Sequence, residues 1–80
     1  MFEAGIKTVG TTIRRLREQR GLTQEEFAHH AGLARTFYGR VERGEQNLGL
    51  KTIFQIAIYL EVEPVDLLKD VSSIDLMRDG

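Results

Sequence analysis

Residues 22–44 read LTQEEFAHHAGLARTFYGRVERG and carry the local signals that decide the fold. Thr23 and Glu26 have the spacing of a capping box, in which each side chain accepts a hydrogen bond from the backbone N–H of the other. This spacing predicts a helix over residues 24–31. Gly32 can then adopt the left-handed conformation that ends a helix and turns the chain.

A second helix is predicted from about Arg35 to Arg43, and Gly44 again supplies a residue that ends a helix. Leu33 is expected to be a buried residue of the intervening turn. Two short helices joined by a tight turn that contains glycine form a helix-turn-helix.

The second helix separates its side chains by chemistry. At about 100° per residue, its basic, small and hydroxylic residues fall within one sector of about 140°. These residues are Arg35, Thr36, Gly39, Arg40 and Arg43. Phe37, Tyr38 and Val41 fall on the other side and can pack on the first helix. The basic side can lie along phosphates and base edges in a major groove. The alternative, a solvated face on an ordinary core helix, is less favoured because the complete motif is present.

The same stretch resembles a known family. The runs TQEEFA (23–28) and VERG (41–44), with the glycine turn between them, are similar to the lambda-repressor and Cro-like helix-turn-helix family, also called the Xre type. The run RGEQNLGLKTI (43–53) adds a similarity to controller proteins of restriction–modification systems. The resemblance covers about residues 9–68. It implies an all-α, five-helix lambda-repressor-like DNA-binding domain whose helices 2 and 3 form the motif.

The resemblance also implies roles for single residues. In the family, an arginine at the place of Arg17 pairs with the glutamate of the ERG motif, here Glu42, and the arginine fork suits a carboxylate. Asn47 matches a position whose side chain often holds the DNA backbone, but a loop asparagine that satisfies its own turn remains equally open. The family commonly has a capping residue at Ala34, whose loss costs about 1 kcal/mol, and a glycine at Glu61.

The remaining helices follow from apolar spacing. Residues 1–5 are expected to be frayed. A first helix is predicted from about Thr8, as its N-cap, to Arg20. Gly10 is expected to weaken its first turn by about 0.5–1 kcal/mol relative to alanine. The residues expected to face the core are Ile6, Val9, Ile13 and Leu16.

A fourth helix is predicted over about residues 50–60 and a fifth from Pro64, which suits the first position of a helix. The residues expected to close the core after Pro64 are Val65, Leu67 and Leu68. Residues 71–80 are either a last short helix capped by Ser73, with Ile74 and Met77 as its apolar residues, or a loose tail. The chain is thus expected to be a single domain, with a core of about residues 8–70.

The net charge of −1 conceals an asymmetry. Residues 7–51 carry nine basic and five acidic side chains, a net charge of +4. Residues 52–80 carry two basic and six acidic side chains, a net charge of −4, and Glu3 supplies the remaining −1. This distribution favours a DNA-binding surface on the first half.

Composition argues against other classes of protein. The chain has no cysteine, so it has no disulfide and no cysteine-based zinc site. His29 and His30 are adjacent and point about 100° apart, so we expect no metal and no cofactor. The N-terminal residues do not resemble a signal peptide, and no apolar run is long enough to span a membrane. We therefore expect a soluble, cytoplasmic protein with no membrane partner.

Catalytic signatures are also missing. Ser72 and Ser73 are the only serines, and no glycine-rich phosphate loop or HExxH-type pair occurs. We expect no catalytic residue and no enzymatic activity. An antitoxin-type interaction module that also binds DNA is the remaining alternative, and its partner would be a toxin or another protein. A co-purified partner or a neighbouring toxin-like reading frame would distinguish it.

We expect the domain to regulate transcription by binding operator DNA. Arg35 can donate two hydrogen bonds to guanine, and the methyl group of Thr36 can contact thymine. Gly39 leaves room for a base or sugar, and Phe37 is a candidate for a thymine methyl. The side chains expected to hold phosphates are Gln24, Arg40, Arg43, Asn47 and Lys51. Gln24 and Lys51 also lie near helix N-termini, whose backbone N–H groups favour anions.

A homodimer is expected because the fourth helix is apolar nearly all round. Ile53, Ile56, Ala57 and Leu60 form the stripe expected to fill the core, and Ile58 lies away from all of them. A partner subunit can cover that second side. A two-fold dimer also places two recognition helices about 34 Å apart on a near-palindromic site. The candidate contacts are Ile58, Tyr59, Val62 and Val65.

Overall fold

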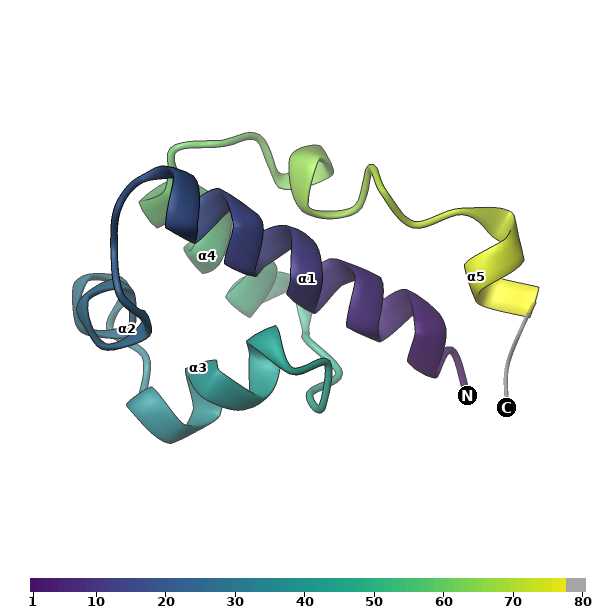
Figure 1. The fold of residues 1–80 in the computed structure, drawn as a ribbon, viewed down its shortest axis with the longest axis horizontal. Coiled ribbons are helices and arrows are strands. Elements are labelled where there is room, and N and C mark those ends of the chain that lie inside the picture. The colour runs from purple at the N-terminus through teal and green to yellow at the C-terminus, as the bar shows by residue number, and fades with distance from the viewer. Residues whose placement is uncertain (78–80) are drawn as a thin grey trace.

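Helix α1 (Glu3–Gln19) runs along the molecule, and α3, η1 and α5 pack along it (Figure 1). The computed structural model describes residues 1–77. Within that range the chain forms five α-helices and one 3-10 helix and no strand, which confirms the all-α prediction. After α1, the elements are α2 (Gln24–Ala31), α3 (Arg35–Glu42), α4 (Leu50–Leu60), η1 (Pro64–Leu67) and α5 (Ser73–Met77). No helix among residues 1–77 combines the length and the apolar character that crossing a membrane requires.

Helix α1 begins at Glu3, so the predicted start at Thr8 and the predicted fraying of residues 1–5 were wrong. Thr8 lies inside the helix, where its hydroxyl donates to the Ala4 carbonyl at 3.0 Å. The added turn packs against α5. Gly5 is buried, and a Cβ atom placed on it would lie 3.2 Å from a methyl of Leu76. Local sequence does not reveal this contact, because its partners are far apart in the chain.

Gly10 marks a close approach between two helices. A Cβ atom placed there would lie 2.5 Å from the carbonyl oxygen of Val41 and 2.7 Å from that of Glu42. Real Cβ atoms do not come so close to backbone oxygens. Gly10 therefore lets α1 rest directly on the end of α3, which is a packing role beyond the local weakening predicted from sequence.

The core lies between α1, α2, α3 and α4. Phe27 and Tyr38 meet at its centre with ring centroids 5.0 Å apart and ring planes at 44°, a tilted arrangement favourable for aromatic pairs. The predicted α4 stripe is confirmed as buried; its members are Ile53, Ile56, Ala57 and Leu60. Ile13 is fully buried, and Val9 and Leu16 pack against the core with part of their surface exposed.

The segment after α4 differs from the prediction. Residues 64–67 form a single 3-10 turn, and only Leu67 reaches the core. Val65 and Leu68, which were also expected to close the core, are 64% and 44% exposed. The reason is geometric: in a 3-10 turn, residues three apart point the same way, so Val65 and Leu68 share one exposed side while Leu67 faces the core. Glu61, where the family often has glycine, adopts a left-handed conformation (φ 60°).

The last turn is helical, which resolves the two possibilities left open for the tail. Its cap is Ser72 and not Ser73: the Ser72 hydroxyl accepts from the Asp75 N–H at 3.2 Å, and Asp75 accepts from the Ser72 N–H at 3.2 Å. Leu76 packs on Gly5, while Met77, expected to be an apolar contact of this helix, is 81% exposed. The rest of the predicted tail, residues 78–80, lies outside the described residues.

Candidate nucleic-acid interface

Helices α2 and α3 and the turn between them form the predicted motif. Thr23 and Glu26 make both hydrogen bonds of the capping box, at 3.1 and 2.8 Å. These bonds from Thr23, above all the one from its backbone, hold the pKa of Glu26 below its ordinary value. Gly32 adopts the left-handed conformation (φ 71°). Leu33, predicted to be buried, is half-buried against the core.

The inner side of α3 is apolar, as its periodicity predicted. Tyr38 is fully buried, and Val41 is 2% exposed. Phe37 is half-buried and packs against the core, so only part of its ring faces outward. Ala34 precedes the helix and provides no side-chain cap, as the sequence indicated.

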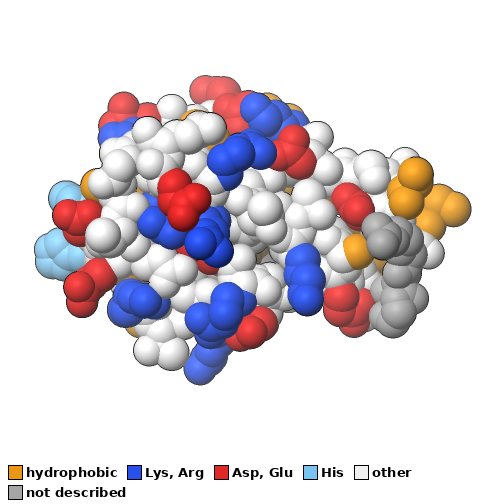
Figure 2. All heavy atoms as spheres, viewed as in Figure 1, with side chains coloured by type: hydrophobic (Ala, Val, Ile, Leu, Met, Phe, Trp, Pro, Cys, Tyr) orange, Lys and Arg blue, Asp and Glu red, His pale blue; other side chains and the backbone are white. Residues whose placement is uncertain are grey.

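The outer side of α3 presents most of the residues expected to contact DNA. Figure 2 shows Lys and Arg side chains gathered over this helix, in the lower part of the view. The expected contact residues that are exposed are Arg35, Thr36, Arg40, Arg43, Asn47 and Lys51. Gln24 is half-buried at the start of α2. The structure thus brings the α3 arginines together on one exposed surface.

Gly39 lies beneath two of these arginines. A Cβ atom placed on it would be 2.8 Å from Arg35 Nη1, 3.2 Å from Arg43 Nη1 and 3.9 Å from Gln24 Oε1. The space that Gly39 leaves is therefore occupied by the ends of flexible side chains. Two guanidinium groups and one amide converge over this glycine, and Arg43 also pairs with Glu45 at 3.2 Å.

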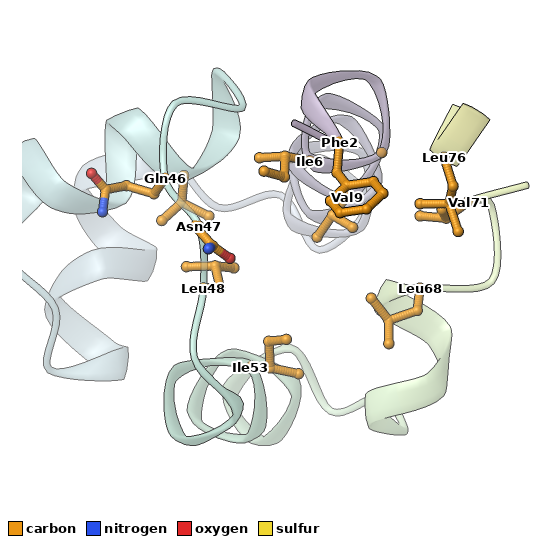
Figure 3. A pocket seen from close by; sticks show the side chains of 13 residues that line it. Phe2, Ile6, Val9, Gln46, Asn47, Leu48, Ile53, Leu68, Val71 and Leu76 are labelled. Carbon is orange, nitrogen blue, oxygen red and sulfur yellow. The ribbon is translucent and has the colours of Figure 1, made fainter. Parts of the chain in front are cut away.

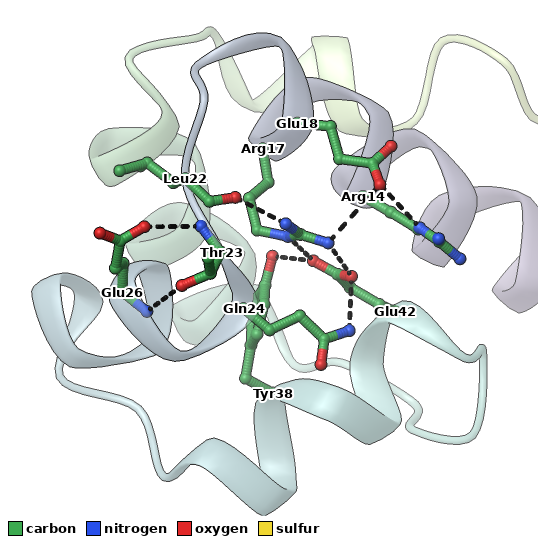
Figure 4. A network of polar contacts seen from close by, with 9 residues as sticks. All are labelled: Arg14, Arg17, Glu18, Leu22, Thr23, Gln24, Glu26, Tyr38 and Glu42. Carbon is green, nitrogen blue, oxygen red and sulfur yellow. Dashed lines mark hydrogen bonds and ion pairs between the residues drawn. The ribbon is translucent and has the colours of Figure 1, made fainter.

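Glu42 is the centre of a buried polar network that holds α3 on α1 (Figure 4). Arg17 Nε donates to Glu42 Oε2 at 2.7 Å, and Arg17 Nη2 donates to Oε1 at 3.0 Å. Arg17 and Glu42 are 7% and 6% exposed. The predicted contact between these two side chains is thus present, as a two-point fork that satisfies both groups.

Three further bonds complete this network. The Tyr38 hydroxyl donates to Glu42 Oε2, Gln24 Nε2 donates to Oε1 at 2.8 Å, and Arg17 Nη1 donates to the Leu22 carbonyl at 2.6 Å. The network therefore ties α1 and the start of α2 to the middle and the end of the buried side of α3. Sequence reasoning missed Tyr38, although its position four residues before Glu42 places the two side chains on one helix face.

The same contacts set the protonation states. Burial alone would raise the pKa of Glu42, but hydrogen bonds from Arg17, Tyr38 and Gln24 hold that pKa below its ordinary value. Burial, together with the hydrogen bond to Glu42, raises the pKa of Tyr38. The hydrogen bond to Glu42 likewise raises the pKa of Arg17. At neutral pH the network therefore consists of a carboxylate, a guanidinium and a neutral phenol.

The arginines on the outer side of α1 are paired differently. Arg15 contacts Asp70 at 3.2 Å, and Arg20 contacts Glu61 at 2.8 Å. Asp70 also accepts from the Thr12 hydroxyl at 2.8 Å, and this bond contributes most to lowering the pKa of Asp70. The basic half of the chain thus neutralises part of the acidic half directly. This leaves α3 as the helix that carries the basic surface.

The outer side of α4 is apolar. Ile58, Tyr59 and Val65, three of the expected dimer contacts, are 67%, 47% and 64% exposed. The fourth, Val62, is half-buried against the core. Leu50 and Phe54 are also exposed, at 67% and 49%. Sequence reasoning missed these two, although residues 50, 54 and 58 share one helix face at intervals of four.

Within residues 1–77, no group of three or more His, Cys, Asp or Glu side chains is arranged to hold a metal ion. His29 and His30 are exposed neighbours whose ring centroids lie 6.0 Å apart. The polar residues expected to contact DNA instead carry guanidinium, ammonium, amide and hydroxyl groups. Such groups are donors suited to phosphates and base edges.

Comparison with known proteins matches this chain to helix-turn-helix proteins. Residues 13–67 match the family HTH_3, described as Helix-turn-helix. The chain is 37% identical over 62 residues to an uncharacterized HTH-type transcriptional regulator, y4dJ, of Sinorhizobium fredii (strain NBRC 101917 / NGR234); the match covers 78% of this chain and 80% of that protein.

Solved structures of restriction-modification controller proteins also match this chain. The restriction-modification controller protein C.AhdI from Aeromonas hydrophila matches with a TM-score of 0.75 and 40% identity, over 78% of this chain and 94% of that one. The controller protein C.Esp1396I, solved as a tetramer in complex with its natural 35-base-pair operator, matches with a TM-score of 0.74 and 31% identity, over 89% and 93% of the two chains.

Proposed function

This chain belongs to the helix-turn-helix family of transcriptional regulators that includes restriction–modification controller proteins, and from this premise we propose that it binds operator DNA as a homodimer. One observation carries the proposal: the outer side of α3 is basic and exposed, while its inner side is held on α1 by the buried Arg17–Glu42 fork. A recognition helix needs a basic outer side and an inner side held on the rest of the domain, and α3 has both.

Sequence readout is assigned to the first turn of α3. Arg35 and Thr36 are exposed there, where a recognition helix contacts base edges in the major groove. Arg35 would donate to guanine O6 and N7, and Thr36 would contact a thymine methyl. The exposed part of Phe37 is a further candidate for a thymine methyl. Arg35 must first leave its position over Gly39, which a flexible side chain can do.

Phosphate contacts are assigned to the groups around this turn. Lys51 lies in the first turn of α4, whose N-cap Gly49 has no side chain, so a phosphate can approach both the ammonium and the backbone N–H groups. Gln24 uses one amide hydrogen on Glu42 and keeps the other for a phosphate. The remaining phosphate contacts of the proposal are Arg40, Arg43 and Asn47.

The dimer is assigned to the outer side of α4 together with η1. Leu50, Phe54 and Ile58 expose a continuous row along the helix, with Tyr59 and Val65 beside its end. Exposed apolar surface of this kind typically marks an interaction site. Two copies related by a two-fold axis would present two α3 helices to a near-palindromic site. Val62 contributes less, because it is already half-buried in its own subunit.

The antitoxin alternative gains no support from the relatives reported above, which are described as a transcriptional regulator and controller proteins. We therefore propose regulation of transcription in the cytoplasm, with DNA and a second copy of this chain as partners.

The deciding experiment is the selection of bound sites from random duplexes. The proposal expects a near-palindromic consensus with two half-sites about one helical turn apart. Selected duplexes should bind much more tightly than random DNA at the same salt concentration. Recovery of no consensus, or of single half-sites only, would contradict dimeric operator recognition.

A further inference from the structure

A pocket of about 210 Å³ opens between the first half of α1, the loop that joins α3 to α4, and the segment that follows η1 (Figure 3). None of the side chains that line it is charged, and only Gln46 and Asn47 carry polar groups. Figure 3 shows Val9, Leu48 and Leu68 directed toward the same central space from three different segments. The pocket thus has walls from parts of the chain that lie far apart in sequence.

The size and lining of this pocket specify a class of ligand. Protein interiors pack at the density of organic crystals, with few voids larger than a water molecule. An engineered apolar cavity of about 150 Å³ in another protein binds benzene, whereas drug-sized pockets begin at about 300 Å³. The present pocket lies between these volumes. A charged group would lose its hydration here without gaining a counter-charge, so the pocket favours uncharged molecules.

The pocket also shares a wall with the surface assigned to DNA. Asn47 lies in the loop that lines the pocket and leads from α3 into α4, where Lys51 is the second residue. Gly44 lies at the start of this loop, and a Cβ atom placed there would be 2.7 Å from Lys7 Cα. α1 therefore touches the loop directly. A molecule held between α1 and the loop would favour one loop position over others.

We propose that this pocket binds a small, uncharged, mainly apolar molecule of one or two rings, and that its occupancy regulates DNA binding. The second part of this proposal, regulation of DNA binding, rests on the proposed function, whereas the first part, ligand binding, does not. The Asn47 amide, which lies beside Leu48 at the pocket, can orient one polar group of such a ligand (Figure 3). Leu76, on the short helix α5, forms the wall that can move with least disruption, since it is still 46% exposed.

Ligand binding is tested with indole as the probe and the full chain labelled at its methyl groups. Nuclear magnetic resonance should show saturable shifts for Ile6, Val9 and Leu48, and no shift for the exposed methyl groups of Leu50 and Ile58. Indole-3-acetate, which carries a charge, should bind more weakly. No saturable shift, or shifts spread equally over α4, would overturn the proposal. Pocket shifts that follow protein concentration without indole would also overturn it, because a second copy would then be the occupant.

Substitutions that fill the pocket with a larger side chain test whether indole binds at this position. Val9→Phe and Leu76→Phe each add a ring to the pocket lining, from α1 and from α5, and each should weaken indole binding about tenfold or more, because the ring takes the space the probe needs. Gln19→Phe adds the same ring at an exposed position at the other end of α1 and should leave indole binding unchanged. Leu76→Phe keeps the test decisive if Val9→Phe does not fold. Unchanged indole affinity in a folded Leu76→Phe chain would refute the site.

Regulation is tested by operator titration with and without saturating indole. Coupling between two sites typically changes affinity by about fivefold or more, and we expect such a change in the wild type and none in Leu76→Phe. An unchanged operator affinity at saturation would overturn the second part of the proposal. If the wild type binds no selected duplex at all, the proposed function fails, and the methyl titration still decides the pocket.

Discussion

Helices α3 and α4 bury one side each in the same core but present opposite outer surfaces. Tyr38 and Val41 anchor α3, and Ile56 and Ala57 anchor α4. Outside, α3 exposes arginines and a threonine, whereas α4 exposes a row of leucine, phenylalanine and isoleucine. Similar core packing therefore accompanies two unlike surfaces, and only the outer residues distinguish the face proposed for DNA from the face proposed for a second subunit.

The two helices also differ in how they are held. α4 is fixed mainly by apolar contacts, which are non-directional. Hydrogen bonds from side chains to backbone carbonyls also hold it, from Gln55 to Ala31 and from Arg20 to Leu60. α3 is fixed in addition by the directional bonds of Glu42 to Arg17, Tyr38 and Gln24. Directional bonds would hold in register the α3 side chains that we propose to read bases, whereas burial of an apolar face depends on them less.

The largest expected effect comes from the inner side of α3. Arg17→Met leaves the Glu42 carboxylate buried without its partner and should destabilise the fold by about 3–5 kcal/mol. Chemical denaturation measures the change. The exposed pair formed by Arg15 and Asp70 is the matched control, and Arg15→Met should cost less than about 1 kcal/mol. A double-mutant cycle with Glu42→Gln that gave no coupling energy would show that the fork does not hold α3.

The contact of α3 with α1 should also be sensitive at Gly10. Gly10→Ala places a methyl group against two carbonyl oxygens and should cost about 1–3 kcal/mol of stability. Gly39→Ala is the control, because the atoms nearest its new methyl are the ends of flexible side chains, those of Arg35, Arg43 and Gln24. Equal thermal stabilities for the two variants would mean that α1 does not rest on α3 as closely as described.

On the outer side of α4, Ile58→Glu should produce a folded monomer. Burying such a side chain contributes about 1.5–3 kcal/mol per subunit, and a charge in its place would have to be desolvated. Sedimentation equilibrium measures the association, and operator binding should weaken with it. Arg40→Glu, on α3, should instead leave the dimer intact while weakening DNA binding. A wild-type chain that stays monomeric at tens of micromolar would contradict the assignment of this face.

On the outer side of α3, Arg35→Ala should cost about 1–3 kcal/mol of operator binding per half-site and relax the preference at one base pair. Lys51→Ala should weaken binding to all sequences and lower the salt slope by about one. Titrations on operator and random duplexes over a salt series separate the two roles. Equal losses on both duplexes for Arg35→Ala would remove it as a base reader.

The smallest expected effect is on how the free energy of unfolding changes as the pH falls below neutral. The network holds the pKa of Glu42 below its ordinary value of 4.5, so its stabilisation is complete above pH 4.5 and is lost as the pH falls through the lower folded value. Glu42→Gln, although less stable at pH 7, should lose less stability on acidification. Glu26 and Asp70 also have lowered pKa values, so some acid sensitivity should remain. Urea unfolding between pH 7 and pH 3 measures this, and parallel curves for the two chains would exclude the effect.

Sequence by itself determined the helix-turn-helix and α4. The capping box at Thr23, the left-handed turn at Gly32 and the α4 stripe all depend on residues within a few positions of one another. Local hydrogen bonding and helical periodicity act over that range, so the local sequence pattern is sufficient to predict these elements. The two faces of α3 followed for the same reason. The contact between Arg17 and Glu42 came from family resemblance and not from local pattern.

Only the tertiary structure decided the features that join distant segments. The early start of α1 depends on Leu76 packing on Gly5, and the role of Gly10 depends on carbonyl groups more than 30 residues away. The bond from Gln24 to Glu42 and the pairing of Arg15 with Asp70 are equally remote in sequence. Periodicity reports which side of a helix is buried but not which segment covers it, because that choice is made by the packing of the whole chain.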